Sequence, residues 1–168
     1  MQLLAQEEYG LRCLLELARH PEGGPLTIQA IARAEGLSTD YAAKLLRELR
    51  RGGLVASTRG AAGGYRLTRA ASELRVWDAI EVLGGGLFPE RFCECHAGLR
   101  SVCVRRSDCS LRALWRLLDS AVREVLEATT LADLQRSESD MAVWLNANPP
   151  AAAGPQGLRR GSDPRREA

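Results

Sequence analysis

Four of the five cysteines in this 168-residue chain are gathered within 17 consecutive residues. They are Cys93, Cys95, Cys103 and Cys109. The segment lacks the paired C-x-x-C motifs of a structural zinc ribbon, and it contains little apolar sequence with which to build a core. Arg100, Arg105 and Arg106 lie among the cysteines, where their charge would offset thiolates and sulfide. This combination favours a soft metal ion or an iron–sulfur cluster.

The same thiols leave other interpretations open. They could form a redox-sensing disulfide pair, belong to a thiol-switch or zinc-binding regulator, or have no special role. His96, which follows the second of these cysteines, is another possible ligand or an exposed loop residue. Cys13 differs because it lies among Leu11, Leu14 and Leu15, so we expect it to be a small buried apolar side chain.

Helical and β-strand patterns around the cysteine segment predict the elements that must position it. Thr27 and Ser38 are suitable N-caps for two short helices, and Gly36 between them suits a left-handed C-cap. Ser110 is the expected N-cap of a long amphipathic helix. The predicted helices cover residues 3–19, 28–35, 39–51, 76–83 and 110–128, with a short helical piece at 130–134, and the predicted strands cover 54–58 and 65–68.

The order of these elements is that of a winged helix-turn-helix domain, in a mainly α-helical chain with a small β-hairpin wing. A glycine turn lets two helices cross steeply, so that the second can enter the major groove of DNA. From Lys44 to Arg75 there are eight basic and two acidic residues, a local charge of +6 in a chain whose net charge is +2. This block predicts a DNA-binding surface, whereas an isolated charge cluster is usually a solvated helix face.

Two groups of residues would contact DNA in such a domain. The third helix offers Ser38, Thr39, Asp40, Tyr41, Lys44 and Arg47, and the hairpin offers Arg59, Gly60, Gly63, Gly64 and Tyr65. Hydroxyl and basic side chains suit phosphates and base edges, whereas Asp40 would cap locally or accept from a cytosine amino group. Arg59 could enter a narrow minor groove, and the hairpin glycines would let the backbone approach the sugar–phosphate chain.

No catalytic constellation stands out in the sequence. The chain has only two histidines, His20 and His96, and it lacks a Ser-His-Asp set, a phosphate-binding loop and paired catalytic carboxylates. We therefore expect that the protein is not an enzyme. A winged helix that binds a protein partner without contacting DNA stays an alternative.

Several local motifs occur together in one known family. They are Gly36-Leu37-Ser38 with Tyr41, Leu49-Arg50-Arg51-Gly52-Gly53-Leu54-Val55, Arg59-Gly60-Ala61-Ala62-Gly63-Gly64-Tyr65, Leu114-Trp115 and Thr130-Leu131-Ala132-Asp133-Leu134. Over about residues 1–135 the chain resembles the Rrf-type winged helix-turn-helix transcription regulators, typified by the iron–sulfur regulators IscR and NsrR. The resemblance implies a homodimer built on the helix from Ser110 to Ala128, which binds a double-stranded DNA operator.

The resemblance also implies an iron–sulfur cluster held by three cysteines and a fourth ligand. Cys103 and Cys109 match the second and third family cysteines, and either Cys93 or Cys95 would be the first. The wider spacing to Cys93 and Cys95 departs from the family pattern, so Cys93 is also a candidate fourth ligand.

Two branches of the family suggest where a fourth ligand could come from. One branch uses a histidine, but its position is Arg112 here, and a guanidinium cannot ligate iron. The NsrR-like branch uses an acidic residue of the partner subunit, and Glu8 holds that place, although Glu8 could equally be a solvated helix residue. We expect a repressor or activator that senses redox, nitric oxide or iron–sulfur status, with 2Fe–2S favoured over 4Fe–4S.

The chain divides into four predicted parts. They are a DNA-binding domain at 1–83, a cysteine-rich cluster-binding loop at 84–109, a dimerisation helix with a terminal helical piece at 110–135, and a disordered tail at 146–168. No apolar run approaches the roughly 20 residues of a bilayer span, and no signal-peptide pattern is visible. We expect a cytoplasmic location without membrane association, where reducing conditions disfavour structural disulfides.

Overall fold

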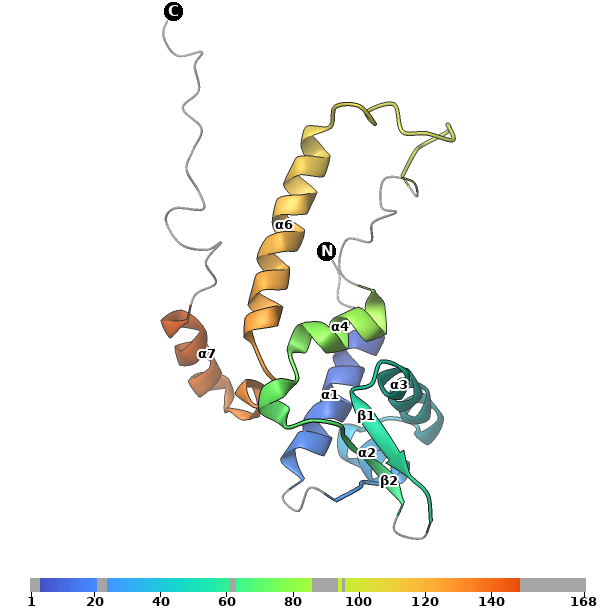
Figure 1. Cartoon of the computed structure of the whole chain (residues 1–168), viewed down its shortest axis with the longest axis vertical. Helices are drawn as coiled ribbons and strands as arrows, with labels where there is room; N and C mark the ends of the chain where they lie inside the picture. The colour runs from blue at the N-terminus through green and yellow to red at the C-terminus, as the bar shows by residue number, and fades with distance from the viewer. Residues whose placement is uncertain (1–3, 21–23, 61–62, 86–93, 95, 149–168) are drawn as a thin grey trace, which may run out of the picture.

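The described part of the chain consists mainly of α-helices and carries one β-hairpin (Figure 1). It comprises residues 4–20, 24–60, 63–85, 94 and 96–148 of a computed structural model. In chain order the elements are α1 (Ala5–Arg19), α2 (Ile28–Glu35), α3 (Thr39–Arg51), β1 (Val55–Thr58), β2 (Gly64–Leu67), η1 (Ala71–Glu73), α4 (Val76–Gly84), α6 (Ser110–Ala128), η2 (Asp133–Gln135) and α7 (Glu138–Ala147). The predicted fold class, a mainly α-helical winged helix-turn-helix, is confirmed.

Local residues fix the turn between α2 and α3. The Oγ1 atom of Thr27 accepts a hydrogen bond from the backbone N–H of Ala30 at 3.2 Å, at the start of α2. Gly36 ends α2 with a φ of 66°, in the left-handed region that favours glycine. The Oγ atom of Ser38 then accepts from the N–H of Tyr41 at 3.2 Å and begins α3. The predicted caps are therefore present, and they set the angle at which α3 is presented.

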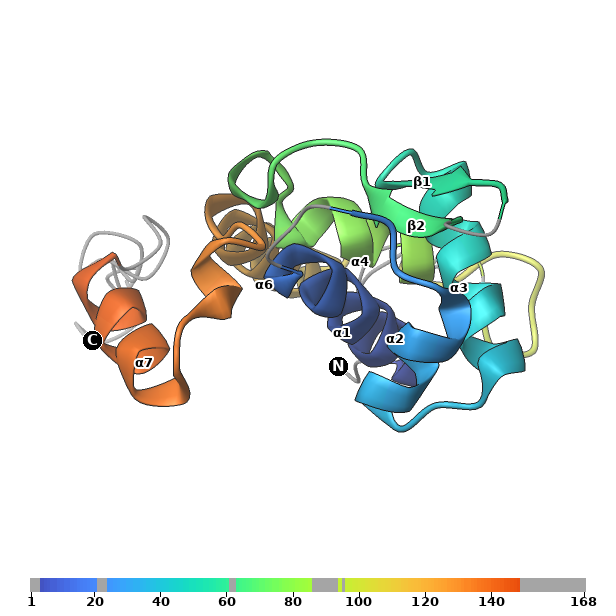
Figure 2. The same ribbon diagram turned by 90° about the horizontal axis from the view of Figure 1, so that it is seen from below.

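The hydrophobic core lies where α1, α2, α3 and α4 meet. Its buried side chains are Cys13, Leu14, Leu17, Ile31, Leu45, Leu46, Leu49, Leu54, Val55, Leu74, Ala79, Leu83 and Leu131. Figure 2 shows α1 in the middle of this bundle, with the other three helices around it. The buried residues of α3 recur at helical spacing, so one face of α3 packs inward and the opposite face is left for solvent.

The first turn of α1 is fastened to the end of α4. The Glu7 side chain is only 1% exposed, and its Oε2 atom accepts a hydrogen bond from the N–H of Leu4 at 2.7 Å. A Cβ atom at Gly84 would overlap the Glu7 carboxylate, and Gln6 Nε2 donates to the carbonyl of Leu83. This contact therefore lies at the end of α4, the last helix before the cysteine segment in the sequence.

The long helix α6 projects from the core, as Figure 1 shows. Its base is anchored because the N–H of Val76 donates to the carbonyl of Thr129 at 2.9 Å, and that of Leu131 donates to the carbonyl of Leu74 at 2.9 Å. The Arg123 guanidinium also stacks over the Trp77 ring, 4.9 Å from its centroid. The base of α6 is thus attached to the strand-like segment that precedes α4.

The start of α6 differs from the sequence-based expectation. Ser110 is the first helical residue and Cys109 holds the cap position, without a side-chain hydrogen bond to the helix. Ser110 as an N-cap is therefore wrong. The hydroxyl of Ser110 lies one residue too far into the helix to accept from the free N–H groups of the first turn, which a side chain at the cap position would reach.

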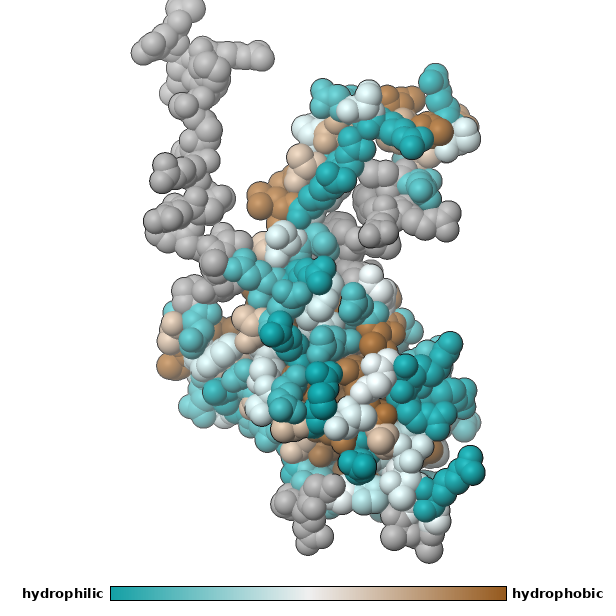
Figure 3. Space-filling view, viewed as in Figure 1, coloured by the Kyte–Doolittle hydropathy of each residue, from teal (hydrophilic) through white to brown (hydrophobic). Residues whose placement is uncertain are grey.

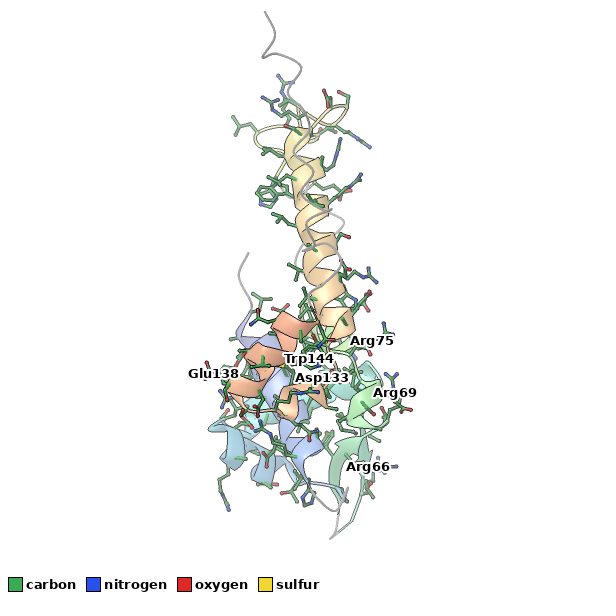
Figure 4. The ribbon with its side chains drawn as sticks, turned by 90° about the vertical axis from the view of Figure 1, so that its left-hand side faces the viewer. Arg66, Arg69, Arg75, Asp133, Glu138 and Trp144 are labelled. Atoms are coloured by element: carbon green, nitrogen blue, oxygen red, sulfur yellow. The ribbon has the colours of Figure 1, made fainter. Side chains whose placement is uncertain are left out.

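A further helix, α7, was not predicted from the sequence patterns. Ser137 Oγ accepts from the N–H of Asp140 at 3.2 Å and caps it, and the Arg136 guanidinium lies 5.2 Å from the Trp144 ring centroid. Figure 4 shows Trp144 and Asp133 near each other at this end of the molecule. α7 includes the first two residues of the predicted tail at 146–168, and residues 149–168 lie outside the described part.

Within the described part of the chain, no helix combines the length and apolar character of a bilayer span.

Candidate nucleic-acid interface and thiol pocket

The first turns of α3 offer their polar side chains to solvent. Ser38, Thr39, Asp40, Lys44 and Arg47 are all exposed. Figure 3 shows hydrophilic side chains gathered over α3. Since Ala42, Leu45 and Leu46 are buried on the other face, the helix axis and its exposed face are held by the core. This is the arrangement of a recognition helix, in which a rigid scaffold presents polar groups to the major groove.

Tyr41 lies differently from its neighbours, because it is half-buried against α1. Its ring meets the ring of Tyr9 edge to face, with centroids 5.9 Å apart and planes at 81°. The Arg12 guanidinium lies 5.4 Å from the Tyr9 centroid, and its Nε atom pairs with the Glu35 carboxylate at 2.7 Å. Hydrogen bonding to Glu35 raises the pKa of Arg12 above its usual value. The contacts tie α1, α2 and α3 together directly beneath the recognition surface.

The hairpin β1–β2 forms the wing. The strands pair antiparallel, with Val55 opposite Leu67 and Thr58 opposite Gly64. Arg50 at the end of α3 donates to Ser57 Oγ at 3.2 Å, which joins the wing to the recognition helix. Arg59 and Gly60 are exposed beside the tip, and residues 61–62 lie outside the described part.

Tyr65 and the glycines before it have structural roles inside the wing. The backbone of Tyr65 exchanges two hydrogen bonds with Leu26, at 2.7 and 2.8 Å. A Cβ atom at Gly64 would overlap the Leu26 carbonyl, and one at Gly63 would overlap the carbonyl of Thr58. These two glycines are therefore required by the packing of the chain against itself, a reason that the sequence alone did not reveal.

Basic residues also lie on β2 and in the segment that follows it, away from the wing tip. Figure 4 shows Arg66, Arg69 and Arg75 along one edge of the molecule. Arg69 lies 3.7 Å from the carboxylate of Asp78, so part of its charge is balanced within the chain.

A pocket of about 250 Å³ lies at the start of α6, and we call it the thiol pocket. The described residues that line it are Glu94, Ser101, Val102, Cys103, Arg105, Arg106, Cys109, Arg112 and Arg116. Cys103 and Cys109 are partly exposed free thiols, so the structure brings two of the predicted ligands to one pocket. Cys93 and Cys95 lie outside the described residues.

Arginines surround the two thiols. Arg112, which occupies the position of a histidine ligand in one family branch, donates from Nη2 to the carbonyl of Arg106 at 2.9 Å. The N–H of Arg106 in turn donates to the carbonyl of Cys103 at 3.1 Å. Arg112 therefore fastens the loop that carries Cys103 and Arg106, which we call the cysteine loop, to α6. Arg112 does not act as a ligand. Arg116, one helical turn further, was missed by the sequence reasoning, although its spacing from Arg112 could have revealed it.

The ligating side chains of the thiol pocket decide whether it fits a metal centre. Cys103 and Cys109 offer two soft thiolate ligands beside positive charge, which suits iron. Among the residues that the structure describes, no three His, Cys, Asp or Glu side chains are gathered closely enough to hold a metal ion. The pocket thus fits part of a thiolate-ligated centre, and further ligands would have to come from outside this group.

The remaining candidate ligands lie apart from the thiol pocket. Glu8 is exposed on the first turn of α1, whereas Cys103 and Cys109 line the pocket at the start of α6, the end of that helix that projects from the core (Figure 1). Within one chain, Glu8 is therefore not brought to the thiols. His96 is exposed. Cys13 is completely buried in the core, as predicted, and burial raises its pKa to about 12.

Comparison with known proteins identifies the family of this chain. The family model Rrf2, described as an iron-dependent transcriptional regulator, matches residues 3–137. The protein rrf2 of Nitratidesulfovibrio vulgaris is 37% identical over 139 residues, which cover 83% of this chain and 90% of that protein.

Two solved structures share both fold and sequence with the chain. The structure of T. potens IscR has a TM-score of 0.64 and 33% identity, covering 80% of this chain and 86% of its own. The structure of CymR, the global cysteine regulator of B. subtilis, has a TM-score of 0.64 and 36% identity, covering 80% and 95%. The chain therefore belongs to the Rrf2 family of DNA-binding transcriptional regulators.

Proposed function

We propose that this protein is a homodimeric cytoplasmic transcription regulator, whose affinity for a DNA operator depends on an iron–sulfur cluster at the thiol pocket. The observation that carries the proposal is that Cys103 and Cys109 line one arginine-rich pocket at the start of a projecting helix. The same chain presents an exposed polar recognition helix and a wing. Under this proposal, one protein of the Rrf2 family would combine a sensing end with a DNA-reading end.

The DNA-reading end follows from the exposed residues of α3 and the wing. The side chains of Ser38, Thr39 and Asp40 would meet base edges or phosphates in the major groove. Lys44 and Arg47 lie one and two turns further and would contact the phosphate backbone. On the wing, Arg59 with Gly60 would enter the adjacent minor groove, where a narrow groove concentrates negative potential.

The exposed apolar face of α6 supports the homodimer. Leu111, Leu114, Leu117 and Leu118 are 40–58% exposed on a helix that has no buried residue. Figure 3 shows apolar surface on this projecting helix. Large apolar patches on soluble proteins mark interaction sites, and a second copy of α6 offers a matching surface. Two recognition helices placed by one dimer would read two half-sites at a fixed spacing.

The charge of the thiol pocket supports a sulfur-ligated anionic group there. Four arginines and Glu94 line it, which gives a formal charge of +3 that thiolates and sulfide would offset. Cys103 and Cys109 would hold the cluster together with Cys93 or Cys95, and Glu8 of the partner subunit is the candidate fourth ligand. A 2Fe–2S cluster supplies reversible electron transfer and sensitivity to oxidants and nitric oxide.

The chain's own residues would carry the change from the pocket to the DNA. Arg112 holds the cysteine loop against α6, and the base of α6 is fastened beside α4. The first turn of α1, which carries Glu8, is also fastened to the end of α4 through Glu7. A change in how the loop is held would therefore alter the spacing of the two recognition helices, and with it the affinity for paired half-sites.

Anaerobic purification tests the proposal directly. We expect a coloured protein that contains iron and acid-labile sulfide, and a DNA affinity for duplexes selected from a random library that changes when the cluster is removed. Cys103→Ala and Cys109→Ala should lose the cluster, whereas Cys13→Ala, which removes a thiol from the core, should keep it. A colourless protein that lacks sulfide even after reconstitution would reject the cluster.

A thiol switch is the second candidate function. It is favoured by the two free thiols that line one pocket and by the similarity to CymR, the global cysteine regulator of B. subtilis. In that case mass spectrometry of the intact protein would show a reversible mass change at Cys103 or Cys109 on oxidation, or bound zinc, in place of iron and sulfide. Loss of DNA binding in a variant with Lys44, Arg47 and Arg59 changed to alanine would support DNA contact for either candidate.

A further inference from the structure

The thiol pocket holds positive charge from two separate elements. Arg105 and Arg106 come from the cysteine loop, and Arg112 and Arg116 come from successive turns of α6. Glu94 is the acidic side chain among the described residues that line the pocket. Guanidinium groups that converge in this way repel one another, so their arrangement is most stable when an anion lies among them.

The surroundings of the pocket add to its preference for anions. The pocket lies at the amino-terminal end of a 19-residue helix, where the helix dipole and free N–H groups favour negative charge. The first turn of α6 contains no acidic side chain, and no side chain caps it. A volume of about 250 Å³ admits a small organic molecule and excludes a macromolecule.

We propose that the thiol pocket binds small organic carboxylate anions, and that it directs anionic disulfides to Cys103 and Cys109. The inference rests on the pocket of the proposed function and does not need a bound cluster. Arginine forks bind carboxylates in a bidentate manner, which places the sulfur–sulfur bond of such a molecule beside the two thiols.

The chemical step is a thiol–disulfide exchange. A thiolate of the pocket attacks one sulfur of the anionic disulfide, and the S–S bond of the reagent breaks. A mixed disulfide forms on the protein, and the other half of the reagent leaves as a thiolate with the electron pair of the broken bond. The protein thiol is oxidised and half of the reagent is reduced, so that no other oxidant is required.

The test uses the full-length, reduced, cluster-free protein and two probes of opposite charge. The anionic probe is 5,5′-dithiobis(2-nitrobenzoate), with two carboxylates, and the cationic probe is cystamine, with two ammonium groups. The rate at each cysteine is followed by acid quenching and peptide mass spectrometry. The rate with the anionic probe is divided by the rate with the cationic probe. This ratio is then divided by the same ratio in urea-unfolded protein, which removes the different intrinsic reactivity of the two probes.

We expect this normalised ratio to exceed one by on the order of tenfold at low ionic strength and to fall as salt is added. The double variant Arg112→Ala/Arg116→Ala should bring the ratio close to one, and the matching lysine variant should restore part of it. Arg123→Ala, on the same helix but away from the pocket, should leave it unchanged. Thermal melting followed by circular dichroism checks that each variant is folded.

Two results would overturn the inference. One is equal ratios in folded and unfolded protein, and the other is a ratio that persists in the Arg112→Ala/Arg116→Ala variant. The outcome is separable from that of the proposed function. A protein with anion preference but no cluster rejects the cluster alone, and a protein with a cluster but no preference rejects this inference alone.

Discussion

The burial of Cys13 separates it chemically from the thiols of the pocket. Its side chain is completely buried, and burial raises its pKa from an ordinary value near 9 to about 12. Because the folded-state pKa is higher than the unfolded one, the stabilisation is complete below pH 9 and is lost as the pH rises toward 12.

Alkaline unfolding of a Cys13→Ala variant tests this assignment. We expect the wild-type protein to lose up to about 1.4 kcal/mol of unfolding free energy per pH unit between pH 9 and 12 through this thiol. The variant should be less stable at neutral pH, but its loss over the same pH range should be smaller. Urea titrations at a series of pH values provide the measurement, and identical slopes for both proteins would contradict the assignment.

Gly84 lies at a position where the packing leaves no room for a side chain. A methyl group there would overlap the Glu7 carboxylate, which is buried between α1 and α4. We expect Gly84→Ala to destabilise the fold by about 1–3 kcal/mol, a common result of overpacking. Adding Glu7→Ser to that variant should recover part of the loss, because it clears the space. Additive losses in the double variant, read from thermal melts, would show that the two residues do not compete.

Sequence reasoning succeeded at residues whose surroundings are local. Cys13 lies among leucines of its own helix, and Ser38 needs only the next turn to act as a cap. It missed the packing of Glu7 and of Gly64, because this packing depends on contacts with Gly84 and Leu26, which are distant along the chain. A carboxylate that is buried by another helix has no signature in its own neighbourhood.

At the scale of elements, we expect the aromatic contact between α1 and α3 to stabilise the recognition helix. The Tyr9 ring meets Tyr41 edge to face, and such pairs contribute about 0.5–1.5 kcal/mol beyond their buried area. We expect Tyr9→Ala to lower the melting temperature and weaken DNA binding several-fold, although Tyr9 lies on another helix. Tyr9→Phe keeps the ring and should keep both properties. Fluorescence anisotropy with a selected duplex gives the affinity.

The exposed face of α3 leads to a separate prediction about how the DNA affinity depends on salt concentration. If Lys44 contacts a phosphate, Lys44→Ala should weaken binding to all duplexes alike and reduce the slope of log affinity against log salt by about one. Arg33→Ala, an exposed arginine on α2, serves as the control and should leave the slope unchanged. Salt titrations of the binding isotherm provide both values, and an unaltered slope for Lys44→Ala would exclude the contact.

Elements with strong local signals were predicted to within a few residues. The range of α2 agrees with the expectation, since a threonine cap and a glycine stop bound it on both sides. Ser110 was misassigned, because an irregular segment precedes α6 and gives no pattern against which to count. The short helix α7 was missed because its apolar residues surround the axis and do not form one stripe.

For the whole molecule, the proposed dimer depends on the leucines of α6. Leu114 and Leu118 are 46% and 40% exposed and lie one turn apart, so a charge at either position would be buried in the interface. We expect Leu114→Glu to shift the protein to a monomer in analytical ultracentrifugation and to abolish high-affinity binding to paired half-sites. Glu127→Gln, at the anchored base of α6, should remain dimeric. A Leu114→Glu protein that stays dimeric would place the interface elsewhere.

The sequence predicted the combination of a winged helix, a cysteine segment and a long helix, because each has its own pattern. The thiol pocket itself was only partly predictable. The clustering of Cys103 and Cys109 was visible, whereas the convergence of arginines from the loop and from α6 depends on how the loop folds back. The separation of Glu8 from the pocket within one chain likewise follows from the direction in which α6 leaves the core.

The lack of any buried residue on α6 has a consequence for how much of this protein a cell must make. Beyond its anchored base, α6 projects without packing against its own core, and helices draw most of their stability from tertiary packing. Under the proposed assembly, each copy would complete the fold of another, so that dilution alone would loosen the end that carries the thiols. The rate at which the protein is synthesised would then itself affect how much DNA-binding dimer is present, in addition to any chemical change at the cysteines.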